Sequence, residues 1–162
     1  MKGTIEQINV KSEKSGERGL PKFSVAASLV TSVGLQDDFN RWRHEKDHDN
    51  RDQAVLLIPR EMIEQLNREG WPIRPGDLGE NFLTAGMEYN AFAVGKRFRL
   101  GAAVEIEISK PCQPCNNLYL LPYVGQDKGP SFLGALRDRR GWFARVLKEG
   151  RVKVGDSIAE SE

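Results

Sequence analysis

The stretch Phe98-Arg-Leu-Gly-Ala-Ala-Val-Glu-Ile-Glu-Ile108 decides the expected fold of this chain. On both sides of Gly101, apolar residues alternate with charged ones at the two-residue period of a strand that has one buried face. A glycine between two such runs indicates a hairpin. The second run leads directly to Cys112 and Cys115, so the sequence predicts two thiols just beyond the end of a strand.

Other strands are predicted N-terminal to this hairpin. The segment Gly3–Val10 carries Ile and Val in a strand-like setting, and Val25–Val33 alternates apolar with small or polar residues. Ala54–Ile58 has the composition of a short buried strand. Between them, Glu13–Lys22 and Asp37–Asp52 are predicted to be polar loops.

Helices are fewer. One is predicted over Pro59–Gly70, because proline suits a first helical turn and glycine commonly follows a last one. Met62, Ile63 and Leu66 would share one face of it. Short helical turns are predicted within Ser131–Leu147. Because strands outnumber helices and do not alternate regularly with them, we expect a mainly β fold, a small mixed-strand barrel with a few short helices.

The composition indicates one globular domain over residues 1–162. Hydrophobic residues make up 39% of the chain and charged residues 29%, which excludes a disordered protein. The 24 Lys and Arg nearly balance the 23 Asp and Glu, so no overall field directs the protein to nucleic acid or to a membrane surface. The longest apolar run, Ala54–Pro59, is too short to span a bilayer, and we expect a cytoplasmic location.

Cys112 and Cys115 are the candidate reactive groups. A disulfide between them would close only a tiny loop, so in a reducing compartment they are better interpreted as reactive or ligating thiols. Pro111 and Pro114 stiffen the backbone around Cys115, and nearby Lys110 favours the charged form of a thiol. Cys115 could also be a buried structural residue, and Cys112 either a resolving thiol or a residue without a chemical role.

Two other interpretations of the cysteines stay open. Their spacing is that of a thioredoxin-type redox pair, although residues 116–119 show little tendency to form the helix which that pair opens. With His44 and His48, four residues apart, they also make a possible zinc site. The histidines lie in a strongly polar segment, and a chain of this size does not need structural zinc.

Several segments, in order and at matching spacing, resemble the MOSC family, whose members are similar to the C-terminal domain of molybdenum-cofactor sulfurases. The most specific is Pro75-Gly-Asp-Leu-Gly-Glu-Asn81. The other matching segments include Gly19–Lys22, Val33–Asp38, Arg51–Leu57, Thr84–Gly86, Pro114–Cys115 and Gly141–Val146.

This resemblance implies a β-barrel-like module that binds the molybdenum cofactor (molybdopterin), or handles sulfur for it, with Cys115 as metal ligand or persulfide carrier. Some family members reduce N-hydroxylated compounds, which implies a small-molecule substrate and electrons from a flavoprotein or another redox partner. The chain itself has no nucleotide-binding glycine motif. The cofactor-binding residues that we predict on this basis are Lys22, His48, Arg51, Glu80, Asn81 and Arg145.

The chain also departs from the family pattern. The family usually has Gly-x-Gly-Asp where this chain has Gly34-Leu-Gln-Asp-Asp38, so a side chain occupies a position that tolerates positive φ. Asp49 and Asn50 stand where glycines are common, and Gln53 where arginine is common. Extra carboxylates repel a phosphate. A non-catalytic binding module of the same fold, without the cofactor, is therefore the alternative hypothesis.

Overall fold

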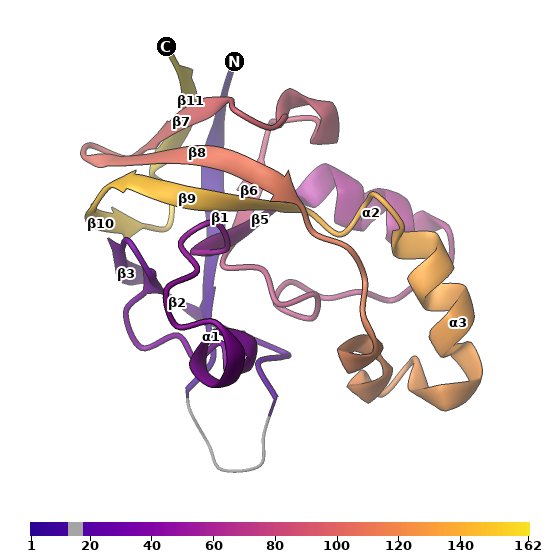
Figure 1. The fold of residues 1–162 in the computed structure, drawn as a ribbon. Coiled ribbons are helices and arrows are strands. Elements are labelled where there is room, and N and C mark those ends of the chain that lie inside the picture. Colours follow the sequence, from indigo (N-terminus) through magenta and orange to yellow (C-terminus); the bar gives the residue numbers. More distant parts are fainter. Residues whose placement is uncertain (13–17) are drawn as a thin grey trace.

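The computed structural model describes residues 1–12 and 18–162, without the side chains of residues 41–43. Most of the fold is a closed barrel of seven strands (Figure 1). Neighbouring strands around the ring are antiparallel, apart from the parallel pair β5 and β6. In ring order the strands are β1 (Lys2–Val10), β11 (Ser157–Ser161), β7 (Arg97–Leu100), β8 (Val104–Pro111), β9 (Trp142–Lys148), β5 (Val55–Pro59) and β6 (Phe82–Ala85), which pairs again with β1. The mainly β, mixed-strand barrel expected from the sequence is confirmed.

Smaller elements surround this barrel. The short strand β2 (Phe23–Val25) extends the sheet beside β1, and a second sheet has the order β10 (Gly150–Lys153), β3 (Ala27–Thr31), β4 (Gly34–Leu35). The helices are α1 (Arg41–Lys46), α2 (Arg60–Arg68) and α3 (Gly125–Leu136), with 3-10 turns η1 (Tyr89–Ala91) and η2 (Asn116–Leu120). None of the described helices combines the length and apolar content needed to cross a membrane.

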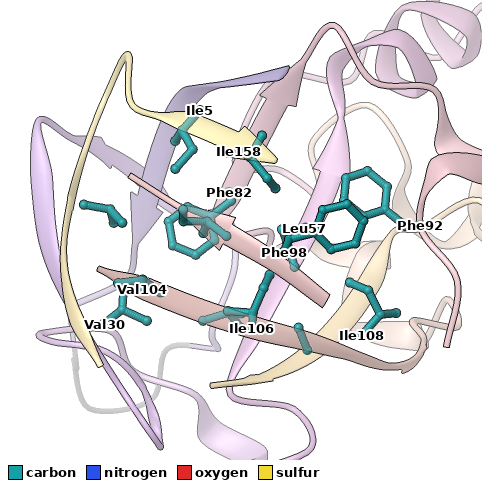
Figure 2. Packing of buried hydrophobic residues seen from close by; sticks show 14 of the residues in the cluster. Ile5, Val30, Leu57, Phe82, Phe92, Phe98, Val104, Ile106, Ile108 and Ile158 are labelled. Atoms are coloured by element: carbon teal, nitrogen blue, oxygen red, sulfur yellow. The ribbon is translucent and has the colours of Figure 1, made fainter. Parts of the chain in front are cut away.

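Apolar side chains fill the inside of the barrel (Figure 2). In β8, Val104, Ile106 and Ile108 are buried while their neighbours are partly exposed, as the alternation in the sequence predicts. The rings of Phe92 and Phe98 lie 4.9 Å apart within the same cluster. Burial on this scale is the main stabilising contribution to the barrel.

A second apolar cluster joins α2, η2 and α3 at one end of the barrel (Figure 1). The buried face of α2 consists of Met62, Ile63 and Leu66, as predicted, and Pro59 is the N-cap of the helix. Phe132 of α3 packs against Trp71, with ring centroids 4.8 Å apart. The two clusters thus belong to a barrel and a helical layer. The chain passes from the barrel to the helical layer at the end of β8.

Three predictions about secondary structure are wrong in part. The segment Asp37–Asp52 was expected to be a loop, but α1 lies within it. Helical turns were expected over Ser131–Leu147, but α3 already begins at Gly125, and residues 142–148 form β9. This segment becomes a strand because β5 and β8 bond to its two edges and Ala144 is buried inside the barrel. The strand expected over Val25–Val33 is broken at Ala26, so that β2 and β3 join different sheets.

Candidate functional site

A pocket of about 790 Å³ opens where β8 ends. Loops from distant parts of the chain meet there, between the barrel and the helical layer. The residues that line it are Gly19, Leu20, Lys22, Phe39, Asn40, Gln53, Leu56, Leu78, Gly79, Asn81, Cys112, Gln113, Cys115, Asn116, Asn117, Arg140 and Phe143. Both cysteines and two of the predicted cofactor-binding residues, Lys22 and Asn81, are among them.

Cys115 is an exposed free cysteine at this pocket, and its sulfur accepts a hydrogen bond from Arg140. The Arg140 side chain is only 7% exposed. Its Nη1 donates to Cys115 Sγ at 3.3 Å and to the Gln113 carbonyl at 3.0 Å, and its Nη2 donates to the Leu78 carbonyl at 3.2 Å. One guanidinium thereby joins the thiol to two different loops of the pocket wall.

A buried ion pair forms another part of the wall. Lys22 Nζ lies 2.6 Å from Asp38 Oδ2, and the two side chains are 6% and 5% exposed. Asn81 Nδ2 donates to the same carboxylate oxygen at 2.8 Å and to the Asn9 carbonyl at 3.2 Å, while its Oδ1 accepts from Leu56 N at 3.0 Å. The positive charge of Lys22 is therefore balanced within the protein.

The Pro-Gly-Asp-Leu-Gly-Glu-Asn segment shapes this wall mainly through its backbone. Gly76 has φ +94°, and a Cβ there would lie 2.2 Å from the Lys22 carbonyl oxygen, so no larger residue fits without a shift. The amide of Lys22 donates to the Gly76 carbonyl at 2.9 Å. Asp77 accepts from the Tyr123 hydroxyl at 2.9 Å. The motif thus holds its own turn against the Lys22 loop.

Glu80 lies fully buried behind the pocket surface. Its Oε1 accepts a hydrogen bond from the Gly76 amide, and its Oε2 has no partner among the described residues. Burial raises the pKa of Glu80 from its ordinary 4.5 to about 7, and the nearby Asp77 carboxylate adds to the increase. Its described contact is with the turn, whereas its neighbours Gly79 and Asn81 line the pocket. Its predicted role in cofactor binding stays a prediction.

The other predicted cofactor-binding residues lie outside the pocket lining. His48 is exposed beyond the end of α1. Arg51 donates to the Ser32 hydroxyl. Arg145 pairs with Asp52 and Glu107, each at 3.0 Å. These three assignments also stay predictions, and the structure does not bring their side chains together with Cys115.

Among the departures from the family pattern, Asp37 adopts φ 63°, so a residue with a side chain has a left-handed backbone here. Asp37 is exposed, whereas the following residue, Asp38, forms the buried pair with Lys22. Gln53 lines the pocket. The extra carboxylate is therefore separate from the one that balances the pocket lysine.

Cys112 has a different setting from Cys115. It is 3% exposed, burial raises the pKa of its thiol, and its amide donates to the Gly141 carbonyl at 2.8 Å. In the part of the chain that the structure describes, no three His, Cys, Asp or Glu side chains are grouped to hold a metal, so the zinc hypothesis has no cluster there. Cys115 precedes a 3-10 helix of five residues, not the long helix that a thioredoxin-type pair opens.

Sequence reasoning missed the most specific contact of the site. Lys110, expected to act on Cys115, lies with its Nζ 6.0 Å from the centroid of the Phe143 ring, and Arg140 contacts the thiol instead. Phe143 lines the pocket, whereas its neighbour Trp142 packs against the barrel core. The matching segment at Gly141–Val146 begins one residue after Arg140 and was the available signal.

Comparison with protein-family models matches residues 44–159 to the MOSC domain. Among curated proteins, the chain is 33% identical over 115 residues to the uncharacterized protein YflK of Bacillus subtilis. This alignment covers 68% of this chain and 49% of YflK. It is 35% identical over 86 residues to a protein named reductase from Gibberella moniliformis. That alignment covers 52% of this chain and 14% of the reductase. The chain thus spans half or less of the length of these relatives.

Solved structures share the fold. The YuaD protein of Bacillus subtilis superposes with a TM-score of 0.80 at 17% identity, covering 98% of this chain and 94% of that one. YiiM of Geobacillus stearothermophilus has a TM-score of 0.72 at 26% identity, and the superposition covers 99% of this chain and 75% of that one. YiiM of Escherichia coli has a TM-score of 0.70 at 22% identity, covering 100% and 70%.

Proposed function

Because the chain belongs to the MOSC family, we propose that it binds the molybdenum cofactor in the pocket beside Cys115, with the Cys115 sulfur as the metal ligand. The single observation that carries the proposal is an exposed thiol at a pocket whose wall also contains a buried guanidinium. A soft sulfur suits a molybdenum centre, and nitrogen donors suit the phosphate and the polar edges of the pterin.

The described residues fit such a group. The free thiol of Cys115 is accessible, and Arg140 is a buried cation whose Nε has no partner in the described part of the chain. Asn116 and Asn117 add amide groups to the lining, and Phe143 an apolar surface. Cys115 would hold the metal, while Arg140 and the asparagines would orient the organic part.

We propose reduction of an N-hydroxylated small molecule as the reaction, with electrons from a flavoprotein or another redox partner. When bound, the cofactor supplies a redox-active metal centre. The chain itself contributes the thiol, the polar donors and a partly enclosed site. The relative named as a reductase supports this direction. Sulfur transfer through a persulfide on Cys115 is the alternative activity of the same site. A cytoplasmic location suits both, since reducing conditions keep the two thiols free.

A specific observation favours the alternative, a binding module without the cofactor. The charge of Lys22 is already balanced by Asp38, and Arg51 and Arg145 are engaged elsewhere. Among the cations predicted from the sequence to bind the cofactor phosphate, none therefore faces the described pocket with an unbalanced charge. Arg140, which sequence reasoning missed, is the cation on which the cofactor hypothesis depends.

The test is to purify the protein from a host that makes the molybdenum cofactor and to measure molybdenum and pterin per chain. We expect both near one per chain, and loss of molybdenum in Cys115→Ser but not in Arg145→Gln, a cation variant outside the pocket. Absence of both species from the native chain would support the binding module. Retention of molybdenum in Cys115→Ser would show that Cys115 is not the ligand.

A further inference from the structure

We propose that Arg140 is the positioning residue of Cys115, which holds the sulfur at the pocket and raises its reactivity through a charge-assisted hydrogen bond. The contact is the 3.3 Å bond from Arg140 Nη1 to Cys115 Sγ. A sulfur that ligates a metal or attacks an electrophile carries negative charge, and a positive donor stabilises that charge. The inference deepens the proposed function and rests on it only in taking Cys115 as the reactive group.

Arg140 has no anionic partner in the described part of the chain. Arg140 is 7% exposed, and its described partners are two carbonyl oxygens and one thiol. No carboxylate in the described ranges lies within ion-pair distance of it, and its Nε is buried without a partner. A buried cation without an anion is costly. The negative charge that the Cys115 sulfur develops when it reacts would balance this cation.

Neighbouring cations show that the chain can supply such a partner. Arg139, the preceding residue, is bonded through both Nη atoms to the Glu69 carboxylate, at 2.6 and 2.9 Å. Lys22, on the same pocket, has Asp38 at 2.6 Å. Arg140 thus differs from these cations in having a thiol where they have a carboxylate.

The loop that carries the two cysteines, residues 112–115, is attached to residues 138–141. Besides the two bonds from Arg140, the Gln113 side chain donates to Asp138 Oδ1 at 2.8 Å and accepts from the Asp138 amide at 3.4 Å. The Cys112 amide donates to the Gly141 carbonyl at 2.8 Å. The whole loop is therefore fixed to residues 138–141, and the guanidinium is the part of this attachment that reaches the sulfur. Position and charge come from one side chain.

The experiment measures the alkylation rate of Cys115 by iodoacetamide at neutral pH in protein purified from a host that lacks the molybdenum cofactor, because a metal-bound sulfur would be protected. Mass spectrometry of the peptide separates Cys115 from Cys112. We expect Arg140→Gln to slow the reaction by about tenfold, the value of one charge-assisted hydrogen bond. Arg140→Lys keeps the charge and should stay within about threefold of the native rate. The matched control, Arg139→Gln, should react at the native rate because its partner is Glu69.

The opposite outcomes are equally clear. If Arg140 only held the loop in place, Arg140→Gln would loosen it and Cys115 would react at the native rate or faster, which overturns the proposal. A similar slowing in Arg139→Gln would also overturn it. Should Arg140→Gln fail to fold, Arg140→Lys decides, since a loss of about tenfold there would show that the charge is not what matters.

The assay needs no cofactor, so the two proposals can fail separately. A chain that purifies without molybdenum or pterin, but in which Arg140→Gln slows alkylation, leaves this inference standing and removes the proposed function. If the native chain binds molybdenum in a cofactor-making host, but Arg140→Gln is alkylated at the native rate in cofactor-free protein, the proposed function stands and this inference is overturned.

Discussion

The two cations of the pocket wall, Lys22 and Arg140, differ in how their charge is balanced. Lys22 is buried against Asp38, and Asn81 bonds the same carboxylate oxygen, so three chain segments are joined and the charge is balanced. Arg140 is buried to a similar degree, but its described partners are carbonyl oxygens and the Cys115 thiol. Lys22 therefore maintains the shape of the pocket, whereas Arg140 is available for the chemistry of the Cys115 sulfur.

The largest expected effect comes from removing the counter-charge of Lys22. Asp38→Ala should lower the free energy of unfolding by about 3–5 kcal/mol, because it leaves a buried ammonium unpaired. Urea unfolding measures this change. The matched control is Glu64→Gln, which breaks an exposed ion pair with Arg60 and should cost less than about 1 kcal/mol. Equal costs for the two variants would contradict a structural role for the Lys22 pair.

A pH dependence should come from Glu80, on the Lys22 side of the pocket. Since its pKa is about 7 in the folded protein and 4.5 ordinarily, folding favours the protonated form. Its contribution to stability is therefore fully present below pH 4.5 and is lost as the pH rises through about 7. Glu80→Gln, which cannot ionise, should lack this loss.

The measurement is urea unfolding of native chain and Glu80→Gln at about pH 4 and about pH 8. The native chain should lose roughly 3 kcal/mol relative to the variant across this range, at about 1.4 kcal/mol for each unit of pKa. Titration of other groups cancels in the difference. A difference between the two proteins that does not change with pH would show that Glu80 is ionised normally.

The two cysteines should separate stability from function on the Arg140 side. Cys112→Ser places a hydroxyl in a site that is 3% exposed, and we expect a cost of about 1–3 kcal/mol in thermal unfolding. Cys115→Ser is at an exposed position and should cost less than about 0.5 kcal/mol, while it removes metal binding. If Cys115→Ser were the more destabilising variant, Cys115 would be a structural residue.

The smallest effect is expected at Arg145. Its two ion pairs, with Asp52 and Glu107, lie at the surface, so Arg145→Gln should change the free energy of unfolding by less than about 1 kcal/mol. Molybdenum content should stay at the native level, because the side chain is outside the pocket. Loss of the cofactor in this variant would instead uphold the assignment of Arg145 from the sequence.

Parts of the candidate site were predictable from patterns in the local sequence. Cys115 follows a recognisable strand and two prolines, and the Gly76 turn lies in the segment that most specifically resembles the family. Lys22 and Asn81 lie in matched segments and do line the pocket. Arg140 was not predicted, because its only signal is the matching segment that begins at Gly141, and nothing else in its immediate sequence distinguishes it from Arg137 or Arg139. Which of these three cations turns inward depends on loops that meet only in the folded chain.

Local sequence patterns were sufficient to predict the barrel, the helix after Pro59 and the place of the thiols, because periodicity, proline and glycine act on the chain locally. The strand at residues 142–148 depends on tertiary contacts, since both of its partner strands are distant in sequence. The way in which the charge of each buried cation is balanced also depends on tertiary contacts. The charge of Lys22 is balanced by Asp38, whereas Arg140 faces Cys115, and charge compensation depends on distances in space that spacing along the chain does not contain.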